Sequence, residues 1–198
     1  MVLAIWVEDE NGNFVSTIFI GNFIGRHGHG NNGNPDFEVD GGDRRSALPV
    51  WAYSRGVIDN THGCGSYYPP AEDTPNYPED VDAVSSATPS ATETTKVWDV
   101  EKLPNGTYNV FLEANVSFDT NAYHDYDAPY FLGQPSVVWK VSIDIGANPV
   151  TAQTLDYAGY GSYNGTNGDL NPPDKTITTA AELLVETNGY RLFASYTP

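Results

Sequence analysis

The chain has 198 residues, of which 39% are hydrophobic and 13% aromatic, so it is long enough to bury the core of one large domain. Its 26 Asp and Glu outnumber its 9 Lys and Arg, which gives a formal net charge of −17. Nucleic acids and anionic lipid surfaces bind clustered Lys and Arg, so this charge argues against both as partners and favours cations, basic partners or simple solubility. The single cysteine excludes an internal disulfide, and no run approaches the ~20 apolar residues of a membrane span.

The chain opens with two predicted strands. Residues 2–7 and 14–20 have strand patterning and are joined by Glu10-Asn11-Gly12-Asn13. Asn-Gly between such runs indicates a hairpin, because both central residues must tolerate a positive φ. Met1 leads directly into the first strand without a visible signal peptide. We interpret this start as a mature exported chain with an added Met, rather than a protein made without a leader.

Three long segments without regular periodicity interrupt the strand pattern, at about residues 21–46, 54–93 and 118–136. Between the first two lies a short apolar stretch, residues 47–53, which predicts one or two helical turns packed on the sheet. The prolines of the second segment argue against a central strand there. Long segments of this kind inside a compact domain usually carry function or are disordered, and their many aromatic residues argue against disorder.

The second half of the chain supplies further predicted strands, at residues 95–100, 107–117, 137–145 and 190–196. Residues 151–160 are a further strand candidate, and residues 180–185 are the best helix candidate. Few lysines, many Asn, Gly, Thr and Tyr, and abundant strands together favour an exported bacterial protein, in the periplasm or at the cell surface.

Three segments taken in order resemble a known family. They are Ala4–Val15 (AIWVEDENGNFV), Asp82–Pro89 (DAVSSATP), and Trp98-Asp99 followed by Leu103–Tyr108 (LPNGTY) and Glu113-Ala114. Together they resemble an uncharacterised family of predicted periplasmic proteins, the domain of unknown function 2271. The last segment is also similar to the immunoglobulin-like domain of flagellar hook-capping proteins. Ser86 stands where the family usually has Gly, so we expect either a different turn there or a left-handed position occupied by a residue other than glycine. The resemblance implies a periplasmic or surface β-sandwich and no assigned activity.

We therefore predict one all-β domain over residues 1–198. Its expected architecture is an immunoglobulin-like antiparallel β-sandwich, built from hairpins, with the three long insertions and at most one or two short helices.

All four histidines and the only cysteine lie in the predicted loops, where functional residues usually sit on a rigid scaffold. The candidate transition-metal ligands are His27, His29, His62, Cys64 and His124. His27-Gly28-His29 and His62-Gly63-Cys64 each place two ligands around a glycine, and imidazoles with a thiolate suit zinc or copper. The alternative is that Gly-rich loops merely tolerate histidine and that Cys64 is a small buried apolar residue.

Oxygen ligands recur in two segments, residues 36–43 and 164–174, of which the second permits the tighter wrap. Its candidate calcium ligands are Asn164, Asn167, Asp169, Asn171 and Asp174. Calcium takes about six to eight oxygens, including backbone carbonyls from turns. Neither segment has the closing glutamate of a calcium-binding loop, and ordinary turn chemistry is the alternative.

Aromatic residues in the insertions give a third candidate site, a surface for carbohydrate or for another protein subunit. The candidate binding residues are Tyr67, Tyr68, Tyr126 and Tyr130. Rings beside carboxylates suit sugars, and aromatic residues also anchor protein interfaces. The alternative is that these rings hold the long loops against the sheet.

Catalysis has little support in the sequence. Ser85-Ser86 lacks a nucleophile-elbow context, no phosphate loop joins a strand to a helix, and the abundant carboxylates single out no pair.

We expect an exported non-catalytic protein, first as a cation-binding structural or accessory component with calcium as the cation. The second hypothesis is a surface assembly or adhesion subunit that contacts carbohydrate or neighbouring subunits. The third is a periplasmic accessory protein that handles copper or zinc or takes part in redox chemistry.

Overall fold

The computed structural model describes residues 2–21, 47–55, 84–86, 103–116, 119–127, 131–146, 154–163 and 167–177. The strands are β1 (Val2–Asp9), β2 (Phe14–Gly21), β3 (Val84–Ser86), β4 (Gly106–Asn115), β5 (Tyr126–Asp127), β6 (Phe131–Leu132), β7 (Val137–Ile145) and β8 (Asp156–Tyr160). A short helix, α2 (Pro49–Ser54), is the one helix within these ranges. The described part of the chain is therefore all-β, as predicted.

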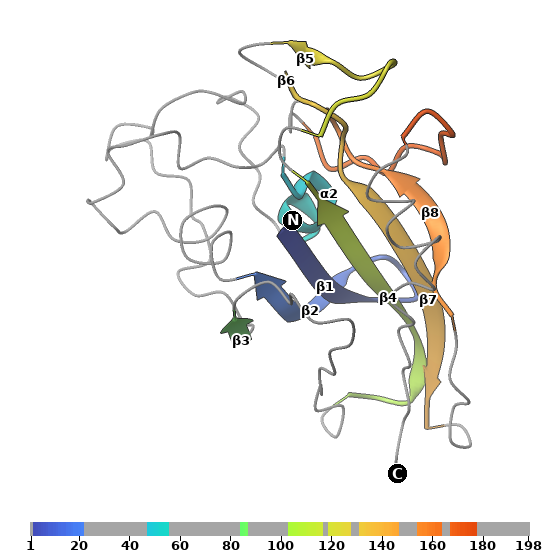
Figure 1. Cartoon of the computed structure of the whole chain (residues 1–198). Helices are drawn as coiled ribbons and strands as arrows, with labels where there is room; N and C mark the ends of the chain where they lie inside the picture. Colours follow the sequence, from blue (N-terminus) through green and yellow to red (C-terminus); the bar gives the residue numbers. More distant parts are fainter. Residues whose placement is uncertain are drawn as a thin grey trace.

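One large sheet contains six of these strands in the order β3-β2-β1-β4-β7-β8 (Figure 1). The five strands from β2 to β8 pair with antiparallel neighbours, and β3 joins the edge parallel to β2. The short strands β5 and β6 form a separate antiparallel ribbon inside the predicted insertion at residues 118–136. The large sheet is thus built around β1 and β4, which come from distant parts of the sequence.

The turn between β1 and β2 confirms the predicted hairpin. Gly12 has a φ of +81°, which glycine adopts without a steric penalty. The carboxylate of Asp9 accepts hydrogen bonds from the backbone N–H groups of Asn11 and Asn13, each at 2.8 Å. Hydrogen bonds from Asn13 are the main reason that the pKa of Asp9 is lowered. A local aspartate and a glycine therefore fix this turn.

Other predicted elements appear with small shifts at their ends. Predicted strands 107–117 and 137–145 correspond to β4 and β7, the predicted helical turns correspond to α2, and the C-terminal half of 151–160 forms β8. Strand β3 lies inside segment 54–93, which was predicted to be irregular; it is three residues long and pairs parallel to β2 at the edge of the sheet. Predicted strands 95–100 and 190–196 and the helix candidate 180–185 lie outside the described residues.

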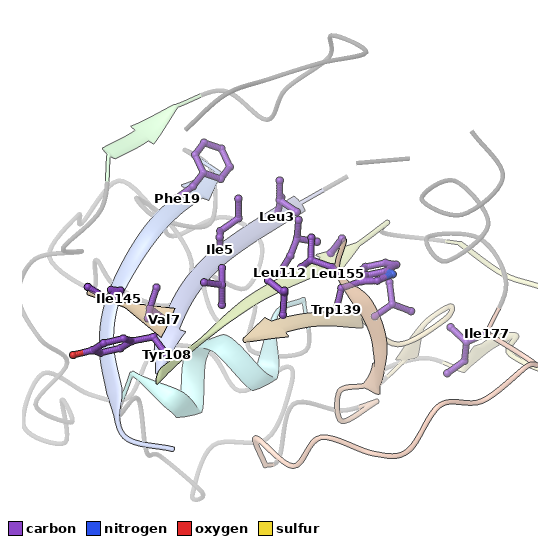
Figure 2. Packing of buried hydrophobic residues seen from close by; sticks show 14 residues of the cluster. Leu3, Ile5, Val7, Phe19, Tyr108, Leu112, Trp139, Ile145, Leu155 and Ile177 are labelled. Atoms are coloured by element: carbon purple, nitrogen blue, oxygen red, sulfur yellow. The ribbon is translucent and has the colours of Figure 1, made fainter. Parts of the chain in front are cut away.

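Both faces of the central strands are buried. One face carries a cluster that includes Leu3, Ile5, Leu112 and Trp139, and Figure 2 shows these side chains gathered along β1, β4 and β7. The opposite face carries Ala4, Trp6, Ile20, Phe111 and Val138, which pack with the residues of α2. The rings of Trp6 and Phe111 stack with their centres 5.0 Å apart.

This double burial places β1 and β4 in the interior of the molecule. Helix α2 covers one face, close to the start of β1 (Figure 1). A second sheet facing the large one is not among the described residues, so the sandwich architecture stays a prediction.

Candidate functional site

A carboxylate buried beneath α2 is the first candidate site. Glu113 on β4 has 0% of its surface exposed. Its Oε1 accepts hydrogen bonds from the backbone N–H of Val50 at 3.2 Å and from the hydroxyl of Ser136 at 2.6 Å. Its Oε2 accepts a hydrogen bond from the backbone N–H of Trp51 at 2.8 Å. Glu113 thus joins β4 to α2 and to the segment that leads into β7.

The sequence of α2 explains why the helix needs this partner. Pro49 in the first turn has no N–H, and Leu48 at the N-cap makes no side-chain capping bond. The N–H of Ala52 already donates to the carbonyl of Leu48 at 3.1 Å. The N–H groups of Val50 and Trp51 are therefore the donors left to satisfy. Glu113 takes the role that Ser, Thr, Asp or Asn at the N-cap usually plays.

Burial raises the pKa of Glu113 from 4.5 to about 7, although the hydrogen bonds from Ser136, Trp51 and Val50 act in the opposite direction. Burial prevails because the charged form has lost its hydration. The packing around the group is tight: a Cβ at Gly161 would lie 2.5 Å from Ser136 Oγ and 3.2 Å from Glu113 Oε1. Glu113 is thus wholly enclosed, and its contacts attach α2 and the segment before β7 to β4.

A second cluster joins three segments, residues 119–127, 154–163 and 167–177. His124 Nδ1 lies 3.0 Å from the hydroxyl of Tyr163, and His124 Nε2 lies 2.9 Å from Thr176 Oγ1. The Thr176 hydroxyl donates to Asp174 Oδ1 at 2.9 Å, and the Thr176 backbone N–H donates to the same oxygen at 2.8 Å. These bonds form a continuous chain of side chains from Tyr163 through His124 and Thr176 to Asp174.

The chemistry of the end groups determines which group donates and which accepts in each of these hydrogen bonds. Hydrogen bonds from Thr176 lower the pKa of Asp174, so its carboxylate is ionised at neutral pH and only accepts. The Thr176 hydroxyl donates to Asp174 and therefore accepts from His124, which places a proton on Nε2. In a neutral imidazole Nδ1 is then the acceptor, and the Tyr163 hydroxyl donates to it. Burial raises the pKa of Tyr163 to about 12, which keeps that hydroxyl protonated.

The loop that carries His124 is fixed by one asparagine. Asn121 Oδ1 accepts hydrogen bonds from the N–H groups of Tyr123 at 2.8 Å and His124 at 2.9 Å. Asn121 Nδ2 donates to Gln134 Oε1 and to the carbonyl of Thr176. The side chain of Tyr123 is nevertheless 72% exposed. The loop thus presents an aromatic ring from a backbone held by hydrogen bonds.

Of the predicted transition-metal ligands, His124 alone lies among the described residues. Both of its ring nitrogens have hydrogen-bond partners, so metal binding would require Tyr163 or Thr176 to give way. The remaining four, His27, His29, His62 and Cys64, lie outside the described residues. Whether the five residues meet stays a prediction.

Four of the five predicted calcium ligands are described, and Asn164 is not. Asn167 Oδ1 accepts from the N–H of Asp169 at 3.2 Å, which is turn chemistry. The backbone N–H and the side-chain amide of Asn171 both donate to the carbonyl of Tyr160. Asp174 Oδ1 is occupied by Thr176, as described above. Within the ranges that the structure describes, no group of three or more His, Cys, Asp and Glu is placed to hold a metal ion.

The predicted aromatic site also lies mostly beyond the described ranges. Tyr67, Tyr68 and Tyr130 fall outside them, and Tyr126 belongs to the short strand β5. The exposed ring of Tyr123, three residues before Tyr126, is the aromatic feature that the structure adds.

Sequence reasoning assigned no role to Glu113 and Tyr163. In a strand with alternating faces, Glu113 falls on the side opposite Leu112 and Ala114, which sequence reasoning treats as the polar side. A signal was present, because Phe111 shares that side with Glu113, and Trp6 on β1 pairs with Phe111. Nothing in the sequence around Tyr163 indicates its contact with His124.

Comparison with known proteins adds no information about the roles of these residues. No protein-family model, curated protein or solved structure matches it. The resemblance to the domain of unknown function 2271 and to hook-capping proteins therefore stays a prediction. No helix in the described part of the chain has the length and apolar character needed to cross a bilayer.

Proposed function

We propose that this protein is an exported, non-catalytic β protein that serves as a structural or accessory component and binds a cation, calcium, through its loops. The observation that carries the non-catalytic part is the use of its ionisable side chains. Glu113 holds a helix to the sheet, and His124 and Asp174 hold loops together. Each of these groups makes hydrogen bonds that connect separate parts of the fold.

The net charge of −17 and the carboxylate-rich loops support a cation as the ligand. Asp169 is the best test residue, because it is exposed and lies in the predicted calcium segment. Its neighbours Asn171 and Asp174 make internal hydrogen bonds, so their substitution would disturb the fold as well as a site.

Thermal unfolding in calcium and in chelator, at matched ionic strength, tests this proposal. We expect calcium to raise the melting temperature of the wild type, and Asp169→Asn to remove most of that increase. Glu10→Gln is the matched control, because it removes one exposed negative charge in a different turn and should leave the calcium effect intact. Equal losses for Asp169→Asn in calcium and in chelator would exclude this segment as the calcium site.

The exposed ring of Tyr123 on a fixed loop favours a second candidate, a surface subunit that contacts carbohydrate or neighbouring subunits. Elemental analysis and sedimentation of the purified protein separate the candidates. Bound calcium supports the first, and self-association without a metal supports the second. Stoichiometric copper or zinc supports the third hypothesis, a metal-handling or redox accessory protein.

A further inference from the structure

Helix α2 is attached to the sheet by polar contacts at both ends. Trp51 Nε1 donates to Thr17 Oγ1 at 3.1 Å, and Ser54 Oγ donates to Glu8 Oε1 at 2.5 Å. The amides of its first turn donate to Glu113, as described above. The two glutamates differ in exposure, since Glu8 is half-buried and Glu113 is wholly buried. Glu113 is thus the ionisable group that opening of the helix would transfer from protein to water.

No charged side chain among the described residues compensates the buried carboxylate. The ionisable side chains on α2, just after it, or on the strand faces that pack against it are Glu8 on β1, Tyr53 and Arg55, Lys140 and the distant, exposed Asp144 on β7, and Asp156 on β8. The two cations face aromatic rings: Arg55 lies 5.1 Å from the ring centre of Trp51, and Lys140 lies 5.2 Å from that of Phe111. Neither cation contributes to the shifted ionisation of Glu113, which follows from burial and its three donors.

We propose that Glu113 makes the docking of α2 proton-dependent, so that the helix is held while Glu113 is protonated and opens more readily once the proton is lost. An ionised carboxylate that opens to water regains its hydration, whereas a neutral acid gains much less. When Glu113 is protonated, the neighbouring group able to accept a hydrogen bond from its carboxyl O–H is the Ser136 hydroxyl. The inference does not depend on cation binding by the loops.

Linkage gives the direction and the pH window. The docked pKa of Glu113 is about 7 and the ordinary value is 4.5, so between these values the docked state holds a proton that the open state lacks. Docking therefore has this contribution in full well below pH 4.5 and loses it as pH rises from there through about 7. The shift corresponds to an increase of about 300-fold in the opening equilibrium across the window.

The position of α2 in the chain gives this opening a consequence. Residues 47–55 connect segments 22–46 and 56–83, which contain His27, His29, His62 and Cys64. A change in the docking of α2 therefore changes the position of residues 47 and 55, to which these segments are bonded. Glu113 is thus a positioning residue for the ends of the two longest predicted insertions.

Amide hydrogen exchange of the full chain tests the proposal at the helix itself. After correction for intrinsic exchange rates, the opening equilibrium of the Val50 and Trp51 amides should rise about 150-fold between pH 4.5 and 8 in the wild type. Glu113→Gln should remove the pH dependence. Glu8→Gln is the matched control, because it alters the other glutamate bound to α2 and should retain the dependence. A wild type whose amides open equally across this range would overturn the proposal, as would Glu113→Gln with an unchanged pH dependence.

Two further measurements do not require Glu113→Gln to fold. The side-chain carboxyl carbon of Glu113, followed by NMR in the wild type, should titrate near pH 7. Ser136→Ala removes a hydrogen bond that lowers this pKa, so the midpoint should move to higher pH. Titration of Glu113 near 4.5, or a midpoint unmoved by Ser136→Ala, would count against proton-dependent docking of α2.

Discussion

At the residue scale, polar side chains in this protein join segments that the sequence separates widely. His124 and Thr176 lie 52 residues apart in the chain, yet His124 Nε2 and Thr176 Oγ1 are within 2.9 Å. Thr176 is the centre of the network, because its hydroxyl contacts both His124 and Asp174. A substitution that keeps its shape and removes the hydroxyl isolates this contribution.

Thr176→Val should therefore lower the free energy of unfolding by about 1 kcal/mol, the net value of a typical hydrogen bond. The Thr176 backbone N–H, which this variant keeps, is the main cause of the lowered pKa of Asp174, and the hydroxyl lowers it further. The hydroxyl's contribution is therefore present above the ordinary value of 3.8 and decreases as pH falls below it. Urea unfolding at pH 7 and at about pH 3 measures both effects, with the difference from wild type narrowing in acid. Thr107→Val is the control, because its exposed bond to Asp144 should contribute less. Equal losses at both positions would show that the Thr176 hydroxyl contributes no more than an exposed hydrogen bond.

At the element scale, α2 depends on its surroundings. A helix of six residues is too short to be stable alone, since its nucleation is costly. Its stability comes from the burial of Pro49, Val50, Trp51 and Ala52 against the sheet, and from the acceptor that Glu113 supplies. The close packing of Pro49 and Ser136 around Gly161 completes this attachment.

Gly161→Ala should consequently lower the free energy of unfolding by about 1–3 kcal/mol, as overpacking usually does. The new Cβ would lie 2.6 Å from Pro49 Cγ and 2.5 Å from Ser136 Oγ. Gly106→Ala is a matched control without positive φ, because its nearest neighbour is Tyr108 Cε2 at 3.9 Å. Urea unfolding of both variants provides the measurement. A Gly161→Ala variant as stable as Gly106→Ala would mean that the packing around Glu113 yields easily.

At the scale of the whole molecule, the chain combines a surplus of negative charge with central strands that are buried on both faces. The net charge of −17 creates repulsion that compact folding intensifies. The burial of the central strands supplies the opposing contribution, because both faces of β1 are removed from water.

Salt should accordingly stabilise the protein. Raising sodium chloride from about 10 mM to about 150 mM shortens the Debye length from about 30 Å to about 8 Å and screens the repulsion. We expect a higher melting temperature by circular dichroism, without any requirement for a divalent cation. A melting temperature that stays constant or falls would mean that the negative charges are already compensated within the fold.

The sequence by itself determined what depends on neighbouring residues. It predicted the first hairpin from Asn11-Gly12, the strands that became β2, β4 and β7, and the short helix α2, because turn chemistry and side-chain periodicity act locally. Only the tertiary structure decided the order of the strands, the burial of Glu113 and the contact of Tyr163 with His124. These depend on which distant segments meet, and alternation along one strand does not reveal whether its second face is covered by water or by a helix.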